Sequence, residues 1–393
     1  MDRRSASCCE PRLSDTARAD VVLGLFDPSG TSHSGNALHG LAHAAHDLAI
    51  PTTVYAHPSV DPSLAPPSVS WIQVEGVAEF VDDESRLTHR RTVNRILGEF
   101  DTGPNRIFCD LGLDRTMRSQ GADVPSDCNT LFVCHRSAAL DVRPVRILRR
   151  LRRQRTRNRR VLRDLGRTGA RFVAHTDVVA ERLADFVPAD QVVKLGWPVQ
   201  SRRAEVLDPN WVPHRVDTTV LFAGSLRAEK GFLPLLDAVQ GVPGFDRLVV
   251  PGRIPKLFRD QISITDPRVE LWDRWLTTNE YEATFASAAL VILPYVAHYR
   301  DRGTMSSVLL EALAYGRPLV VSDSIAHLLP PSYNGAIVVD VSTPASIAAG
   351  VRRALSQLSE LEHAAMTDGR RFIAEHHTYE GYIDGIVRAG TRT

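Results

Sequence analysis

Short runs of β-branched residues alternate with amphipathic stretches along most of the chain, and this alternation limits the fold more than any other feature. Buried strands that alternate with amphipathic helices are typical of βαβ units on a parallel sheet. In the first half of the chain, one such helix is predicted over residues 36–49. Strands are predicted at residues 21–26, 52–56, 105–110, 130–135, 170–175 and 191–196.

The alternation stops at residues 197–217, which are rich in proline and polar residues and have no clear period. It then restarts, with strands predicted at residues 218–224, 246–252, 268–272, 289–295, 318–323 and 335–340. A chain of 393 residues is also longer than one compact core usually supports. The sequence therefore predicts an α/β protein with two Rossmann-like, doubly wound domains that face a central cleft.

The break in the alternation sets the expected domain bounds. We expect a disordered tail at residues 1–20, a first domain at residues 21–199 and a second domain at residues 200–375. Closure of a cleft between two domains needs a hinge, which we expect at residues 196–199, where the sequence is GWPV. The sequence does not indicate an oligomeric state.

Composition argues against several classes of protein. The formal net charge of +1 predicts no general attraction to nucleic acid. The five cysteines lack C-x-x-C spacing, which argues against a disulfide framework or a structural zinc site. We also find no apolar run typical of a spanning helix or a signal peptide, so we expect a cytoplasmic protein. Abundant arginine and alanine with little lysine indicate a GC-rich bacterial source.

The stretch LFAGSLRAEKGF, residues 221–232, begins as a buried strand and then turns through two glycines and two cations. Gly224 lets the backbone approach a ligand, and Arg227 and Lys230 come from the same loop, before a helix whose amides point toward it. This pattern is typical of a diphosphate site. The alternative is a solvated turn with incidental charges. The rarity of lysine, with three among 47 basic residues, argues against incidental placement.

A second polar loop follows the strand that ends near residue 294. It contains Gly303, Thr304, Ser306 and Ser307, and either serine is a plausible N-cap for the helix that follows. The start of that helix would offer free N–H groups to an anion. Glu311 lies little more than one turn inside the helix, where a carboxylate can accept both hydroxyls of a ribose. The alternative is an ordinary exposed helical glutamate.

These two segments, GSLRAEKG and SSVLLEALAYGRPLVVSD, resemble the second domain of GT-B glycosyltransferases, in particular the retaining family 4. The resemblance covers most of the chain. It implies that Arg227 and Lys230 hold the donor diphosphate and that Glu311 holds the ribose. Two positions depart from the commoner pattern: Ser225 replaces an arginine, and Gly303 replaces the first glutamate of the E-x7-E motif, as in some divergent branches.

The resemblance also assigns the acceptor to the first domain. The loop between the first strand and its helix matches a glycine-rich loop that approaches the donor, so Ser34 and Gly35 are predicted donor contacts. His33 in the same loop is either an acceptor contact or a surface histidine. His135 ends a strand where the family often has a histidine near the reacting sugar, and Asp110 is a weaker acceptor candidate. Residues 376–393 are expected to form a helix that packs back on the first domain.

The function implied is transfer of a sugar from a UDP- or GDP-sugar to an acceptor hydroxyl with retention. The predicted catalytic residues are Arg227, Lys230 and His135. No cofactor or metal is expected, since the sequence has no D-x-D pair. The destination is a polysaccharide, another glycoconjugate or a secondary metabolite. Two alternatives stay open: a sugar-nucleotide epimerase of the same architecture, and a catalytically silent scaffold.

The run of arginines from Arg143 to Arg167 holds twelve arginines and a single acid, in a segment with helical propensity. Three interpretations compete: a solvated basic face, a patch for an anionic membrane or phosphorylated acceptor, and a nucleic-acid site. Nucleic acid is the least favoured, because the segment has no aromatic residue and the chain is nearly neutral.

Overall fold

The computed structural model describes residues 20–27, 32–74, 83–100, 103, 105–119, 121–125, 128–135, 149–199, 211, 217–301 and 303–391. The chain divides into two compact units, Met1–Leu195 with Tyr379–Thr393, and Gly196–Thr378. The sequence had placed the bounds after residues 199 and 375. The tail expected at residues 1–20 lies outside the described residues except for Asp20. Within the described residues, no helix is both long and apolar enough to cross a bilayer.

The first unit contains a parallel seven-stranded sheet with the order β3-β2-β1-β4-β5-β6-β7. Its strands are β1 (Val22–Asp27), β2 (Thr52–Ala56), β3 (Ser70–Gln73), β4 (Arg106–Asp110), β5 (Asn129–Cys134), β6 (Arg171–Ala174) and β7 (Val192–Lys194). The six strands predicted from the sequence are confirmed. The edge strand β3 was not predicted, because its side chains are mostly exposed and lack an apolar run.

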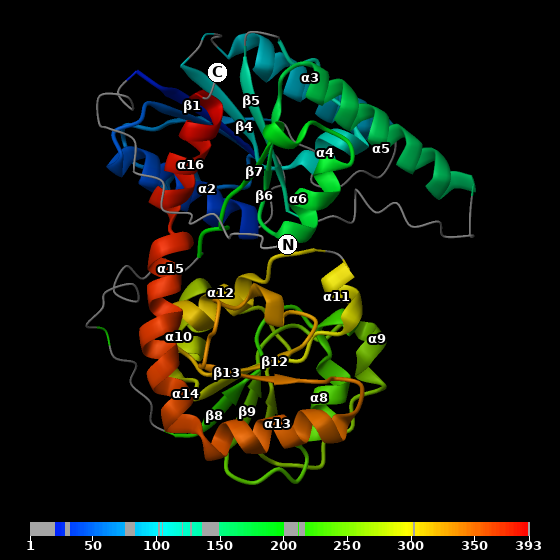
Figure 1. Ribbon diagram of the computed structural model, residues 1–393, viewed down its shortest axis with the longest axis vertical. Coiled ribbons are helices and arrows are strands. Elements are labelled where there is room, and N and C mark those ends of the chain that lie inside the picture. Colours follow the sequence, from blue (N-terminus) through cyan, green and yellow to red (C-terminus); the bar gives the residue numbers. More distant parts are fainter. Residues whose placement is uncertain are drawn as a thin grey trace, which may run out of the picture. The chain divides into compact units, whose positions relative to one another are not determined.

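Helices cover both faces of this sheet (Figure 1). One face carries α2 (Ser32–Asp47) and α16 (Tyr379–Thr391), which pack on each other; Tyr379 occupies the space that a side chain at Gly40 would fill. The other face carries α3 (Asp83–Glu99), α4 (Leu113–Arg118), α5 (Arg149–Arg167) and α6 (Asp177–Ala184) around one apolar core. The chain thus returns from the second unit to complete the first.

The second unit contains a parallel six-stranded sheet with the order β10-β9-β8-β11-β12-β13. All six strands predicted here are confirmed: β8 (Thr219–Leu221), β9 (Arg247–Val250), β10 (Val269–Leu271), β11 (Leu290–Leu293), β12 (Leu319–Ser322) and β13 (Ala336–Val339). With two parallel sheets, each covered by helices, the predicted α/β class with two doubly wound units is confirmed.

The two faces of the second sheet bury separate cores. One core includes α8 (Phe232–Val239) and α13 (Pro344–Ser356), which has Thr343 as its cap and Pro344 in its first turn. The other includes α10 (Thr278–Ser287), α12 (Ser307–Ala314) and α15 (Arg370–His376). The remaining short helices are α9 (Lys256–Arg259), α11 (Ala297–Asp301) and α14 (Leu358–Ala364).

The strand order of each sheet reverses at one place, between β1 and β4 in the first unit and between β8 and β11 in the second. In open α/β sheets, ligands bind outside the carboxyl ends of the strands at such a reversal. The fold therefore indicates where a site should be sought in each unit. The predicted hinge residues 196–199 belong to the second unit, where the N–H of Val199 donates to the carbonyl of His377 (2.9 Å).

Candidate active site

The loop after β8 depends on two glycines. Gly224 has a φ of +103°, and a β-carbon there would lie 3.0 Å from Cγ2 of Val308 on α12. Gly231 has a φ of +70°, and a β-carbon there would lie 1.9 Å from the carbonyl oxygen of Pro294 after β11. Both positions need glycine, because other residues rarely adopt these angles and have no room here. The glycines thus bring the β8 loop against the end of β11 and the start of α12.

Lys230 is the central charged residue of this edge and is only 5% exposed. It ends the 3₁₀ turn Ala228–Lys230, and its Nζ donates a hydrogen bond to the hydroxyl of Tyr295 (2.7 Å). The same nitrogen lies 4.4 Å from the centre of the Tyr295 ring and 5.8 Å from that of Tyr299. A cation over aromatic rings at these distances is attracted to their π-electrons.

Burial lowers the pKa of Lys230 to about 8. The nearby Arg227 lowers this pKa further, whereas Tyr299 and Glu229 raise it. Within the part of the chain that the structure describes, no carboxylate forms an ion pair with Lys230. A buried cation without an anionic partner is costly unless a ligand supplies the negative charge. The arrangement is therefore suited to binding an anion.

Arg227 begins the same turn and is 46% exposed at its side chain, where it pairs with Glu229 (3.2 Å). Its charge acts on Lys230, as the shift in the pKa of Lys230 shows. The structure thus brings together the two cations predicted from the sequence. Glu229 also fixes the turn through its backbone, since its carbonyl accepts a hydrogen bond from the N–H of Val296 (3.0 Å).

The first turn of α12 lies beside the β8 loop through Val308 and Gly224. Of the two serines predicted as caps, Ser306 is the cap, and its Oγ accepts from the N–H of Leu309 (3.3 Å). Ser306 also donates to the hydroxyl of Tyr295 (3.4 Å). The helix start, Lys230 and Tyr295 therefore form one connected group.

Glu311 is buried on α12, so the alternative of an exposed helical glutamate is wrong. Its charge raises the pKa of Tyr281 on α10, so the two side chains are neighbours. Gly303 is buried with a φ of +59°, and Thr304 and Ser307 are half-buried. The segment before them is not all loop as predicted, because α11 forms one short helix within it.

Tyr295 and Tyr299 are the site residues that the sequence analysis missed. Both are buried, and their rings lie 4.6 Å apart. The sequence pattern had placed Tyr295 at the end of a strand. The sequence did contain a signal for this pair: two tyrosines stand four residues apart, after a buried strand and before a polar loop.

The strand ends at the reversal in the first unit are arranged differently. Asp110 ends β4 and is buried; its carboxylate accepts from the N–H of Gly112 (2.8 Å) and from the hydroxyl of Thr116 (2.5 Å). Burial raises the pKa of Asp110 to about 7 against these hydrogen bonds, with Asp27 of β1 adding to the rise. Two of its acceptor sites are thus used within its own loop, and its predicted contact with the acceptor stays a prediction.

His135 follows β5 and is half-buried. Its Nε2–H donates to the carbonyl of Leu111 (2.8 Å), which fixes the ring at this sheet edge. A second histidine, His175 after β6, lies beside it with ring centres 5.2 Å apart. The structure thus places His135 at the carboxyl edge of the sheet, where the sequence analysis expected it, and its catalytic role stays a prediction.

His33, Ser34 and Gly35 lie in the first turn of α2, which begins at Ser32. The prediction of a loop up to residue 35 and a helix from residue 36 is therefore wrong for these positions. Their side chains lie outside the described residues, so their predicted contacts stay predictions. In the described ranges, no cluster of three or more His, Cys, Asp and Glu side chains is placed to hold a metal ion.

Known proteins resemble this chain, in sequence over part of the second unit and in structure over both units. Residues 217–357 match the family described as Glycosyl transferases group 1. Sucrose-phosphate synthase from Thermosynechococcus elongatus has a similar structure, with a TM-score of 0.65 and 14% identity over 93% of this chain and 96% of that one. The glycosyltransferase WaaG, involved in lipopolysaccharide biosynthesis, has a TM-score of 0.60 and 17% identity over 92% and 97%.

A third similar structure is HepE from Anabaena in complex with UDP and glucose, with a TM-score of 0.59 and 12% identity over 92% of this chain and 96% of that one. No curated protein matches the sequence. The similar structures cover both units, and the family match covers all six strands of the second sheet. The chain therefore has the GT-B fold of these glycosyltransferase structures, and its residues 217–357 match the family of glycosyl transferases group 1.

Proposed function

We propose that the chain transfers a sugar from a nucleoside diphosphate sugar, carrying UDP or GDP, to an acceptor hydroxyl with retention of configuration. The observation that carries this proposal is the buried ammonium of Lys230. It lies at the reversal between β8 and β11, beside the start of α12, and no carboxylate among the described residues pairs with it. The structural likeness to HepE, which binds UDP, favours UDP as the nucleotide.

The chemistry follows from where negative charge develops. As the sugar leaves, the diphosphate gains charge on its departing oxygen, and cations fixed beside that oxygen stabilise the transition state more than the ground state. Lys230 and Arg227 supply this charge, and the free N–H groups at the start of α12 add to it. The leaving phosphate takes the acceptor proton on the same face of the sugar, which gives retention. This step requires no metal.

The remaining donor contacts follow from the positions on α12 and its loop. We assign the ribose hydroxyls to Glu311 and the sugar or phosphate oxygens to Thr304 and Ser307. Gly303 leaves the donor sugar without the carboxylate found in the commoner family pattern. His135 and the first turn of α2 are the proposed contacts of the acceptor side. Resemblance to family 4 and the likeness to WaaG favour a bacterial glycoconjugate as the product.

A panel of UDP- and GDP-sugars tests the proposal. A donor should raise the melting temperature of the protein, because a ligand that binds only the native state stabilises it by mass action. With an acceptor or water present, the same donor should release UDP or GDP. Stabilisation without release would favour a binding scaffold, whereas an altered sugar nucleotide would identify an epimerase. No stabilisation by any donor would contradict the proposal.

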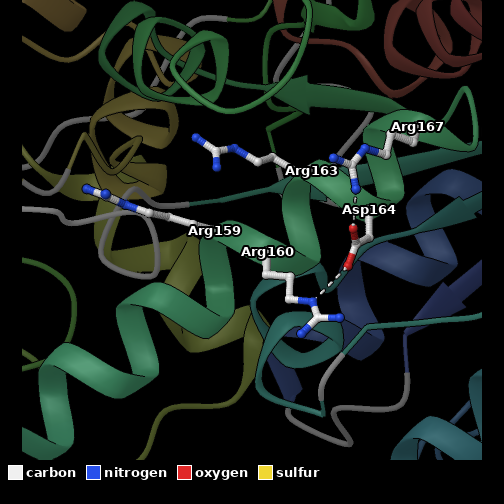
Figure 2. A pocket seen from close by; sticks show the side chains of 5 residues that line it. All are labelled: Arg159, Arg160, Arg163, Asp164 and Arg167. Carbon is white, nitrogen blue, oxygen red and sulfur yellow. Dashed lines mark hydrogen bonds and ion pairs between the residues drawn. The ribbon is translucent and has the colours of Figure 1, made fainter.

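The helix α5 is the proposed contact with an anionic membrane surface. Its apolar residues Val161, Leu162 and Leu165 are buried in the core, so its outer face is left with arginines. Figure 2 shows Arg160 and Arg167 paired with Asp164, while Arg159 and Arg163 point away from that group. The side chains of Arg160 and Arg167 are 84% and 78% exposed. Residues 143–148 of the arginine run lie outside the described residues.

Vesicle flotation tests whether the arginines of α5 bind an anionic membrane or are only solvated. The protein should float with vesicles of phosphatidylglycerol but not with those of phosphatidylcholine, and the binding should weaken with salt. Replacing Arg160, Arg163 and Arg167 by glutamine should abolish flotation. The matched control replaces three exposed arginines of the second unit, Arg352, Arg353 and Arg371. Equal flotation with both lipids would remove the membrane contact.

A further inference from the structure

Tyr295 stands out among the residues around Lys230 because nothing in the transfer chemistry requires an aromatic residue there. We propose that Tyr295 is a positioning residue, which holds the Lys230 ammonium at the carboxyl end of β8 without neutralising its charge. The part of this inference that concerns the diphosphate rests on the proposed function. The part that concerns Lys230 itself does not.

Tyr295 makes two contacts with the ammonium, a hydrogen bond and a cation–π contact. Its hydroxyl accepts a hydrogen bond from Nζ at 2.7 Å, and the centre of its ring lies 4.4 Å from the same nitrogen. An ammonium has three N–H donors, so one bond to Tyr295 leaves two for oxygens of a ligand. Gly224 keeps the space beside the ammonium open, because a β-carbon there would lie 3.4 Å from Nζ.

Tyr295 is itself rigidly placed. Its side chain is fully buried, and its carbonyl accepts a hydrogen bond from the hydroxyl of Ser324 (2.5 Å). Ser306, the cap of α12, donates to its phenol oxygen (3.4 Å). Tyr295, and with it the ammonium of Lys230, is therefore fixed by contacts from three elements: the end of β11, the start of α12 and the turn after β12.

The phenol suits this role because it is neutral. Burial raises the pKa of Tyr295 well above its ordinary value, so the hydroxyl keeps its proton at physiological pH. The other groups that face Lys230 are Arg227 and Glu229 on its own turn and Tyr299 on α11, and Glu229 pairs with Arg227. A carboxylate in place of Tyr295 would hold the ammonium equally well but would cancel the charge that a diphosphate needs.

Lysine-selective NMR tests the hold on Lys230 without any ligand. The chain has only three lysines, so labelling with [ε-¹³C]lysine gives three signals, which single replacements of Lys194 and Lys256 assign. In the wild-type protein, Lys230 should titrate near pH 8, and its ε-protons should be shifted upfield by the Tyr295 ring. A lysine that titrates at its ordinary pKa without a ring shift would overturn the proposal, and this readout needs no variant.

The variant Tyr295→Phe keeps the ring and removes the acceptor. The titration of Lys230 should then move about one pH unit lower, since a hydrogen bond to a charged group favours the charged form. Tyr299→Phe is the comparison variant: its hydroxyl bonds the carbonyl of Met305 and not Lys230, so its effect on the titration should be smaller than that of Tyr295→Phe. An unchanged titration in Tyr295→Phe would contradict the proposal.

Calorimetry with inorganic pyrophosphate extends the test to the ligand. Wild-type affinity should fall as the pH rises past about 8, and in Tyr295→Phe this fall should begin at lower pH. Tyr295→Leu, which loses the ring as well, should bind more weakly than Tyr295→Phe. A purely structural role would weaken binding equally at every pH. If the wild type binds no pyrophosphate while the NMR shifts are present, the proposed function fails and the hold on Lys230 stands.

Discussion

Each sheet has a buried ionisable group at its carboxyl edge, beside the reversal of its strand order, but the surroundings of the two groups differ. In the first unit, Asp110 is bonded by Gly112 and Thr116 of its own loop. In the second unit, Lys230 is held by a neutral phenol and has no carboxylate partner within the described residues. A strand-end group whose hydrogen bonds come from its own loop is tied to the fold, whereas a buried cation that lacks a counter-ion is available to a ligand.

Replacing Lys230 tests this comparison with the largest expected effect. In Lys230→Met, sugar transfer should fall about a hundredfold or more, because one cation is lost from the developing charge. The variant should fold, since methionine removes a buried charge that costs stability below pH 8. Lys256→Met, which changes an exposed lysine of the same unit, is the control. Turnover near the wild-type value in Lys230→Met would refute the assignment.

The variant Gly224→Ala tests whether the ligand approaches the backbone of the β8 loop, and its control accounts for the effect of backbone strain. The added methyl group would contact Val308 and Nζ of Lys230, so nucleoside diphosphate affinity should fall roughly tenfold, in line with about 1–2 kcal/mol. Gly241→Ala is the matched control, because Gly241 also has a positive φ but a β-carbon there would have no neighbouring atom within 4 Å. Both variants should lose stability through backbone strain, and Gly224→Ala should lose more, because only its β-carbon meets a neighbouring atom. Equal affinity in both would show that the β8 loop does not contact the donor.

Asp110→Asn should affect stability and not donor binding. The folded pKa of Asp110, about 7, lies above its unfolded value, so the group favours folding while it is protonated. This contribution is lost as the pH rises from about 4 to about 7. In Asp110→Asn, the melting temperature should therefore vary less between about pH 5 and about pH 8. Asp185→Asn, at an exposed position, is the control, and an unchanged pH profile in Asp110→Asn would contradict the assignment.

Most of the fold was predictable because its strands are buried on both faces. Runs such as residues 289–295 are apolar throughout, which distinguishes them from the helices between them. The edge strand β3 lacks that signal, since only Trp71 among its residues is even partly buried. The start of α2 was placed four residues late, because serine, histidine and glycine at residues 32–35 are weak helix formers, so local propensity favours a later start.

The cations of the candidate site were predictable, but their environment was not. Glycine, arginine and lysine after a buried strand identified the β8 loop from local sequence alone. The contact of Lys230 with Tyr295 joins residues far apart in the chain, so local patterns do not reveal it. The surroundings of Asp110 were not predictable either: the sequence placed it at a strand end, but not its hydrogen bonds with Gly112 and Thr116.

Calorimetric titration with UDP and GDP, into the wild type and into Lys230→Met, tests the central claim most directly. The account predicts that the wild type binds at least one of the two near neutral pH, that Lys230→Met binds it about a hundredfold more weakly, and that Lys256→Met binds it normally. Wild-type affinity retained in Lys230→Met would contradict the claim that this buried ammonium binds the donor diphosphate.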